Sequence, residues 1–132
     1  MIAFDTWAHA PAQGLAPGGN DGLLDDPDHD GVANLLEFAL GGLPLVATRE
    51  ILPKLAQTNG TWVFEYDRSN LARATTQQVV EYGSDLTGWT PLTIPETSAG
   101  AVTIVPGTVS AHVTVTLPVL GTTGFVRLKV GQ

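Results

Sequence analysis

Residues 59–67 read NGTWVFEYD, and this stretch indicates a strand that follows a tight turn. A type I′ turn needs two positive φ values, which an Asn-Gly pair tolerates best. In the strand, Trp62, Phe64 and Tyr66 alternate with other residues, so their side chains share one face. We expect this aromatic face to contact the core and the turn to join two antiparallel strands.

The same alternation continues through the rest of the chain. From about residue 51 the hydrophobic pattern has a period of two, and turn residues recur about every 8 to 12 positions. Val113, Val115 and Leu117, for example, alternate with polar residues. Seven short strands with this spacing are typical of an immunoglobulin-like or fibronectin type III-like antiparallel β-sandwich. The expected strands are 53–58, 61–67, 77–83, 89–94, 101–105, 111–117 and 124–130.

The first fifty residues have a different, helical pattern. Phe4 and Trp7 recur at helical spacing, and a second apolar face runs from Val32 to Leu40 before a Gly-Gly-Leu-Pro stop. The fold class that we predict is therefore mainly β with a small α part. We expect one helix over 2–10, which Pro11 ends, and a second over 32–40. Both lie in a segment 1–50, and the sandwich over 51–132 is expected to pack with this segment as one structural unit.

The negative charge is concentrated in the helical segment. The formal net charge is −7, and residues 51–132 contain as many bases as acids. No basic stripe exists to meet phosphates, which argues against a nucleic-acid partner. Acidic residues gathered this closely repel one another unless a cation joins them. The acids of the first fifty residues, against the single base Arg49, are Asp5, Asp21, Asp25, Asp26, Asp28, Asp30, Glu37 and Glu50.

Residues 26–37 read DPDHDGVANLLE, which matches the twelve-residue calcium loop of an EF-hand. Calcium takes six to eight hard oxygens, and the Gly at position 6 permits the sharp turn that the loop needs. Magnesium is disfavoured because it seldom uses an all-protein cage. The alternative is an acidic turn that holds no ion. The predicted Ca²⁺ ligands are Asp26, Asp28, Asp30, the backbone carbonyl of Val32, Asn34 (through water, or else as a local cap) and Glu37.

This loop resembles the calcium loops of dockerin modules and thrombospondin type 3 repeats, notably in Asn34 at position 9. The resemblance implies that the Asp, Asn and Glu side chains are ligands. Dockerins carry two such loops, whereas this chain has one. Position 8 is the small Ala33, and Gly18-Gly19-Asn20 precedes the loop in place of an entering helix.

A wider resemblance covers nearly the whole chain. It is carried by Phe4 and Trp7, by DPDHDGVANLLEFALGGLP, by YDRS, by EYGSDLTGW and by the final FVRLKV. These features are similar to the C-terminal region of many large bacterial secreted and envelope proteins, where it forms a non-catalytic tail. The resemblance implies a secreted or cell-surface location, with neighbouring domains of a larger parent as partners. We expect any export signal to lie upstream, because the N-terminus has no basic and apolar leader.

Other chemistries find less support in the sequence. The chain has no Cys, and its three His share no metal-ligand spacing, so we expect no zinc site. Ser69, Ser84, Ser98 and Ser110 lack a GxSxG context. We interpret Glu65, Asp67, Glu81 and Asp85 as outward-facing or turn residues rather than a glycosidase pair. We interpret Trp62 and Trp89 as core residues rather than sugar platforms, and Trp7 as the residue that docks the first helix against the sandwich.

We therefore expect a calcium-binding accessory or interaction domain rather than an enzyme. A carbohydrate-binding module of a polysaccharide-acting enzyme is the alternative, and exposed coplanar aromatic side chains on one sheet face would favour it. A cell-surface protein or a glycan is then a further possible partner. No run of about 18 apolar residues is present, so we expect no membrane insertion.

Overall fold

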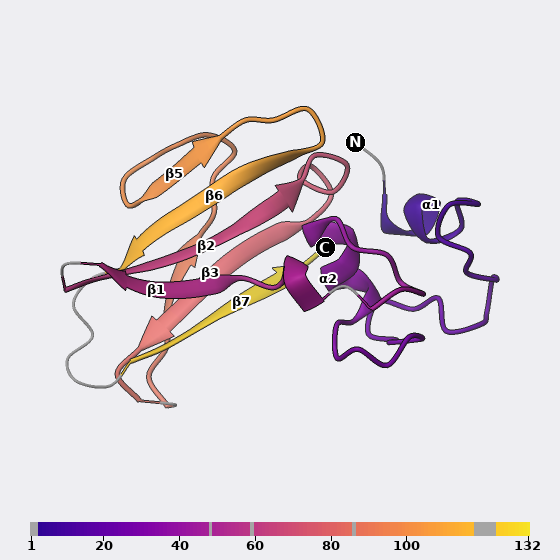
Figure 1. The fold of residues 1–132 in the computed structure, drawn as a ribbon, viewed down its shortest axis with the longest axis horizontal. Helices are drawn as coiled ribbons and strands as arrows, with labels where there is room; N and C mark the ends of the chain where they lie inside the picture. The colour runs from indigo at the N-terminus through magenta and orange to yellow at the C-terminus, as the bar shows by residue number, and fades with distance from the viewer. Residues whose placement is uncertain (1–2, 48, 59, 86, 118–123) are drawn as a thin grey trace.

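The computed structural model describes residues 3–47, 49–58, 60–85, 87–117 and 124–132. Two antiparallel sheets share one core, and two short helices gather at one end of them, beside the C-terminus (Figure 1). The first sheet has the strand order β1-β2-β6-β5 and the second β4-β3-β7. The elements are α1 (Phe4–Ala8), α2 (Asn34–Leu40), the 3₁₀ helix η1 (Arg49–Ile51), β1 (Lys54–Thr58), β2 (Thr61–Ser69), β3 (Gln77–Gly83), β4 (Thr90–Thr93), β5 (Val102–Val105), β6 (Ser110–Leu117) and β7 (Phe125–Gly131).

The seven predicted strands are confirmed, with ends that differ by two residues or fewer. The expected hairpin between β1 and β2 is present, because Thr58 pairs with Thr61. Gly60 has the positive φ of 78° that the predicted turn requires, while Asn59 lies outside the described residues. The local signals of alternation and turn chemistry were sufficient here, because a two-residue turn fixes the register of the strands that it joins.

The core lies between the sheets and uses the aromatic face of β2. Phe64 and Tyr66 are buried and pair with Val115 and Val113 of β6. Val80 of β3 is fully buried in the same cluster, and Trp62 packs against it while half-buried. A buried side chain of this size stabilises the fold by about 1.5–3 kcal/mol relative to an exposed one.

The helices build a second, aromatic cluster. Phe4 and Trp7 of α1 meet Phe38 of α2, with ring centroids 5.2–5.8 Å apart. Ala72 and the half-buried Val130 join this cluster to the strands. Trp7 therefore docks α1 mainly against α2, whereas the sequence predicts docking against the sandwich itself. The helix α2 makes the connection to the sandwich, because its Ala39 and Leu40 belong to the core between the sheets.

Both helices are shorter than the sequence predicts. The first ends at Ala8, ahead of Pro11, because a residue before proline is pushed out of the helical region. The second begins at Asn34 rather than at residue 32, since Ala33 is extended, with φ −68° and ψ 155°. Ala33 therefore belongs to the acidic loop and not to the helix. Gly41 ends α2 with a φ of 81° in the left-handed region.

Neither described helix is long and apolar enough to cross a membrane.

Candidate metal centre

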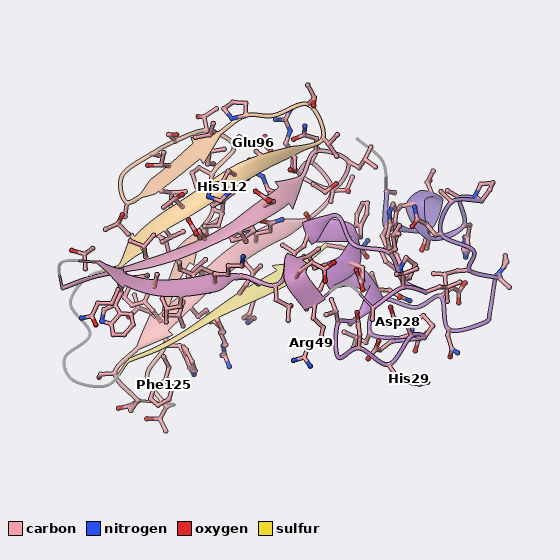
Figure 2. The ribbon with its side chains drawn as sticks, in the orientation of Figure 1. Asp28, His29, Arg49, Glu96, His112 and Phe125 are labelled. Carbon is pink, nitrogen blue, oxygen red and sulfur yellow. The ribbon has the colours of Figure 1, made fainter. Side chains whose placement is uncertain are left out.

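The acidic loop turns sharply between two anchored ends. Two residues in it have positive φ, His29 at 57° and Gly31 at 87°. At its ends the Asn34 N–H donates to the Asp25 carbonyl and the Leu35 N–H donates to the Leu23 carbonyl, both at 2.9 Å. Figure 2 shows Asp28 and His29 on this loop beyond α2, away from His112 on the sheets. The loop is thus a closed turn at the start of a helix.

Three aspartates converge inside this turn. Carboxylate oxygens of Asp26, Asp28 and Asp30 lie within 4.8 Å of one another. Each side chain also accepts a backbone hydrogen bond: Asp26 Oδ2 from Gly31 at 2.9 Å, Asp28 Oδ1 from Asp30 at 3.3 Å, and Asp30 Oδ1 from Val32 at 2.8 Å. The loop therefore fixes all three carboxylates by one oxygen.

The other oxygens of two of these carboxylates are buried without a hydrogen bond. Asp26 Oδ1 and Asp28 Oδ2 have no partner in the structure. Burial raises the pKa of the Asp28 carboxyl above its ordinary value; the hydrogen bond from the Asp30 N–H opposes this, and the neighbouring carboxylates of Asp26 and Asp30 raise the pKa further. A buried, unbonded acceptor costs about 1–3 kcal/mol, and more when it is charged. A cation beside these oxygens would remove that cost.

Asn34 fixes the loop from the helix side. It is 0% exposed, and its Nδ2 donates to the carbonyls of Asn20 at 2.9 Å and Gly22 at 3.0 Å. Its Oδ1 is also buried without a partner. The structure therefore shows a tether to the preceding segment, which is neither of the two predicted roles. The ligand role through water stays a prediction. The tether reaches twelve to fourteen residues back, and no local sequence signal specifies such a contact.

Val32 and Glu37 are the remaining predicted ligands, and both are buried. The Glu37 side chain is 0% exposed and is not among the carboxylates that lie within 4.8 Å of one another in the described chain. Its carboxylate lies against Gly42, where any added Cβ would overlap it. Val32 is buried at 1% exposure and donates its N–H to Asp30. The predicted bidentate role of Glu37 thus remains a prediction.

Two acidic residues outside the predicted ligand set organise the approach to the loop. Asp21 accepts from His9 Nε2 at 2.7 Å and from the Gly18 N–H at 2.9 Å, and these bonds lower its pKa. Asp25 accepts from the Gly22 N–H at 2.8 Å. The His9 contact ties the end of α1 to the segment before the loop.

The other titratable candidates are paired on the sheet surfaces. His112 meets Asp67 through Nδ1 at 2.8 Å and Glu65 through Nε2 at 3.3 Å, and the Asp67 hydrogen bond is the main cause of its raised pKa. Glu81 accepts from Arg127 Nε at 2.8 Å. Backbone hydrogen bonds from Thr87 and Gly88 lower the pKa of Asp85, which lies in the expected turn. These pairings support the interpretation as surface and turn residues.

The expectation that Trp89 is a core residue is wrong. Tyr82 pairs with Thr90. The side chain of the residue before Thr90, Trp89, therefore lies on the outward face of the second sheet. There the Arg127 guanidinium covers its ring at 4.1 Å from the centroid. The large hydrophobic side chains that are exposed in the described chain are all Leu or Val, so no exposed aromatic platform is found among those residues.

Comparison of the chain with protein-family models, with curated proteins and with solved structures found no match.

Proposed function

We propose that the chain is a non-catalytic, calcium-binding accessory domain of a secreted or cell-surface bacterial protein, and that it mediates contacts with neighbouring domains or with a partner. The observation that carries the metal part is the pair of buried, unbonded oxygens, Asp26 Oδ1 and Asp28 Oδ2, inside a turn whose other oxygens are already used. A converging set of carboxylate oxygens suits a hard cation.

The donor chemistry favours calcium among the hard cations. The converging atoms are carboxylate oxygens, the chain has no Cys, and His29 is exposed at the loop surface. Oxygen-only sites suit calcium, magnesium and manganese, and the flexible geometry of calcium tolerates irregular cages best. Asn34 Oδ1 is a further buried oxygen in this region that lacks a partner. We assign Asp26, Asp28 and Asp30 as ligands, with the Val32 carbonyl, Asn34 and Glu37 completing the set on ion binding.

The strand order supports an immunoglobulin-like assignment of the sandwich. If β1 to β7 are named A, B, C, C′, D, E and F, the sheets have the orders A-B-E-D and C′-C-F. The first order is that of an immunoglobulin constant domain. The second corresponds to its partner sheet C-F-G with C′ added and with no strand in the place of G among the described residues. The accessory role is supported by the surface carboxylates that could have formed a catalytic pair. Among the described residues, Glu65 and Asp67 pair with His112, and Glu81 pairs with Arg127.

A calcium titration of the EDTA-treated protein tests the proposal. We expect saturable binding of one ion by isothermal titration calorimetry and a higher melting temperature in calcium than in EDTA. Asp26→Asn should abolish both effects, whereas Asp5→Asn, a control at an exposed aspartate of α1, should preserve them. An unchanged melting temperature and no binding heat across millimolar calcium would refute the metal part.

A further inference from the structure

The second sheet has an edge that no other described strand covers. β7 pairs with β3 on one side, and its other side has no partner strand among the described residues. In Figure 1, β7 (yellow) runs along the margin of its sheet toward the helices. Unpaired backbone N–H and C=O groups on such an edge form a template for another strand.

An apolar groove runs beside this edge. One part, of about 290 Å³, is lined by Leu36, Leu52, Phe64, Val126 and Leu128 among others. A second part, of about 210 Å³, shares Leu36 and Leu128 and continues to Leu24 and Val130. We call these two parts together the edge groove. Its lip is Leu24, whose side chain is 86% exposed. A strand laid along β7 would cover this side chain and insert alternate residues into the groove.

The outer face of the same strand has an excess of positive charge. Arg127 and Lys129 both approach one carboxylate, that of Glu81, at 2.8 and 4.0 Å. Their side chains are 50% and 62% exposed, and Arg127 and Lys129 line the two parts of the groove respectively. One carboxylate cannot neutralise two cations, so the edge remains positive in a chain of net charge −7.

This charge selects against a second copy of the chain. Antiparallel β7–β7 pairing centred on Leu128 places Arg127 opposite Lys129, and centring on either neighbour places a cation opposite itself. Like charges directly opposite destabilise a strand pair. A strand with acidic residues at these positions and apolar residues between them would match both the charge and the groove.

We propose that β7 and the edge groove bind an extended segment of a partner polypeptide, apolar at alternate positions and acidic at the intervening ones. The segment adds a fourth strand to the second sheet. Its apolar side chains enter the groove opposite Val126, Leu128 and Val130, and its carboxylates meet Arg127 and Lys129. Main-chain hydrogen bonds give such complexes their affinity, and the alternating pockets give specificity. This inference rests on the interaction role in the proposed function, and the groove is lined by none of the proposed metal ligands.

Labelled peptides test the pairing directly. The probe is Gly-Gly-Val-Glu-Val-Glu-Val-Gly-Gly, compared by fluorescence anisotropy with a Lys-for-Glu version and with a version whose central Val is Pro. We expect the acidic peptide to bind at least tenfold more tightly than either, and its NMR shift changes to fall on residues 126–130. No binding at millimolar peptide would overturn the proposal and identify the charges as protection of the edge. Equal binding of the Pro peptide, or shifts on another edge, would also overturn it.

Matched variants separate the contributions of groove and charge. Lys129→Glu should weaken the acidic peptide at least tenfold and strengthen the basic one, whereas Lys54→Glu on the edge strand β1 should change neither. Leu24→Ser should weaken binding at least fivefold, with Val109→Ser as its control, because Val109 is 77% exposed away from the groove. A dimer in sedimentation that Leu24→Ser dissociates would overturn the proposal in favour of a second copy. Calcium binding is measured in the same samples, so loss of either activity alone identifies which proposal fails.

Discussion

Replacing Asp28 by Asn should have opposite effects on stability with and without calcium. The buried Asp28 Oδ2 has no hydrogen bond, and the carboxylates of Asp26 and Asp30 lie within 4.8 Å of this side chain. Two unit charges at that distance repel by about 1 kcal/mol in a water-like dielectric, and by more in a less polar one. Neutralising Asp28 removes two such repulsions while keeping an oxygen for the Asp30 N–H. In EDTA, Asp28→Asn should therefore unfold at a higher temperature than the parent.

Calcium should reverse this order. At an ion concentration about 100 times the dissociation constant, binding stabilises the parent by about 2.7 kcal/mol. For a domain of this size that is a shift of roughly 10 °C in the melting temperature. Asp28→Asn loses a ligand and should gain little of this shift. Calorimetry at low salt should therefore show Asp28→Asn with the higher melting temperature in EDTA and the parent with the higher melting temperature in excess calcium.

The rank change is the decisive result, because general damage to the fold would lower the melting temperature in both buffers. Asp5→Asn is the matched control and should follow the parent in both. Equal calcium shifts in the parent and Asp28→Asn, together with a lower melting temperature of Asp28→Asn in EDTA, would refute the reasoning about the buried oxygens.

Two further substitutions test the tether and the surface histidine. Asn34→Ala should reduce the free energy of unfolding in urea by about 2–3 kcal/mol, because it removes two hydrogen bonds donated by a buried amide. Asn70→Ala, which removes one exposed bond to Gly107, should cost under about 1 kcal/mol, and equal losses would contradict the tether. His112 has a raised pKa through Asp67 and Glu65, so its pairing contributes fully below the unfolded pKa of about 6.5 and is lost as the pH rises through the folded pKa. The parent should accordingly lose its stability advantage over His112→Gln as the pH rises above about 6.5, and a pH-independent difference would exclude the ion pairs as its source.

The sequence was sufficient for the strands because their signals are local. Alternation identifies the buried face of β2, and a two-residue turn sets its pairing with β1. Trp89 shows the limit, since its direction depends on which residue of β3 pairs with β4, and a one-residue slip moves every side chain to the other face. The pairing of Tyr82 with Thr90 comes from tertiary contacts that alternation alone does not encode.

The acidic loop was also predictable in part. The spacing of the three aspartates and the Gly31 turn can be recognised because each is required by the geometry of the loop itself. The later start of α2 follows from the same loop, since Val32 donates to Asp30 while Ala33 is extended. The amide of Asn34, in contrast, binds carbonyls in a separate segment, so its burial could be seen only once the chain was folded.

The loop and the edge groove are joined by α2, so binding at one should affect the other. Asn34 at the start of α2 closes the loop, Ala33 and Leu36 line the groove beside β7, and Leu40 is packed in the core. An ion that orders the loop also fixes Ala33, which reduces the entropy that a partner strand must remove. Coupling between binding sites is reciprocal, so the acidic peptide should raise the calcium affinity by the same factor by which calcium raises the peptide affinity. Two titrations measure both factors, and because Asp26→Asn removes the ion without touching the groove, its peptide affinity should equal that of the parent in EDTA. A peptide affinity that is identical in calcium and in EDTA would show that α2 transmits nothing between the two sites.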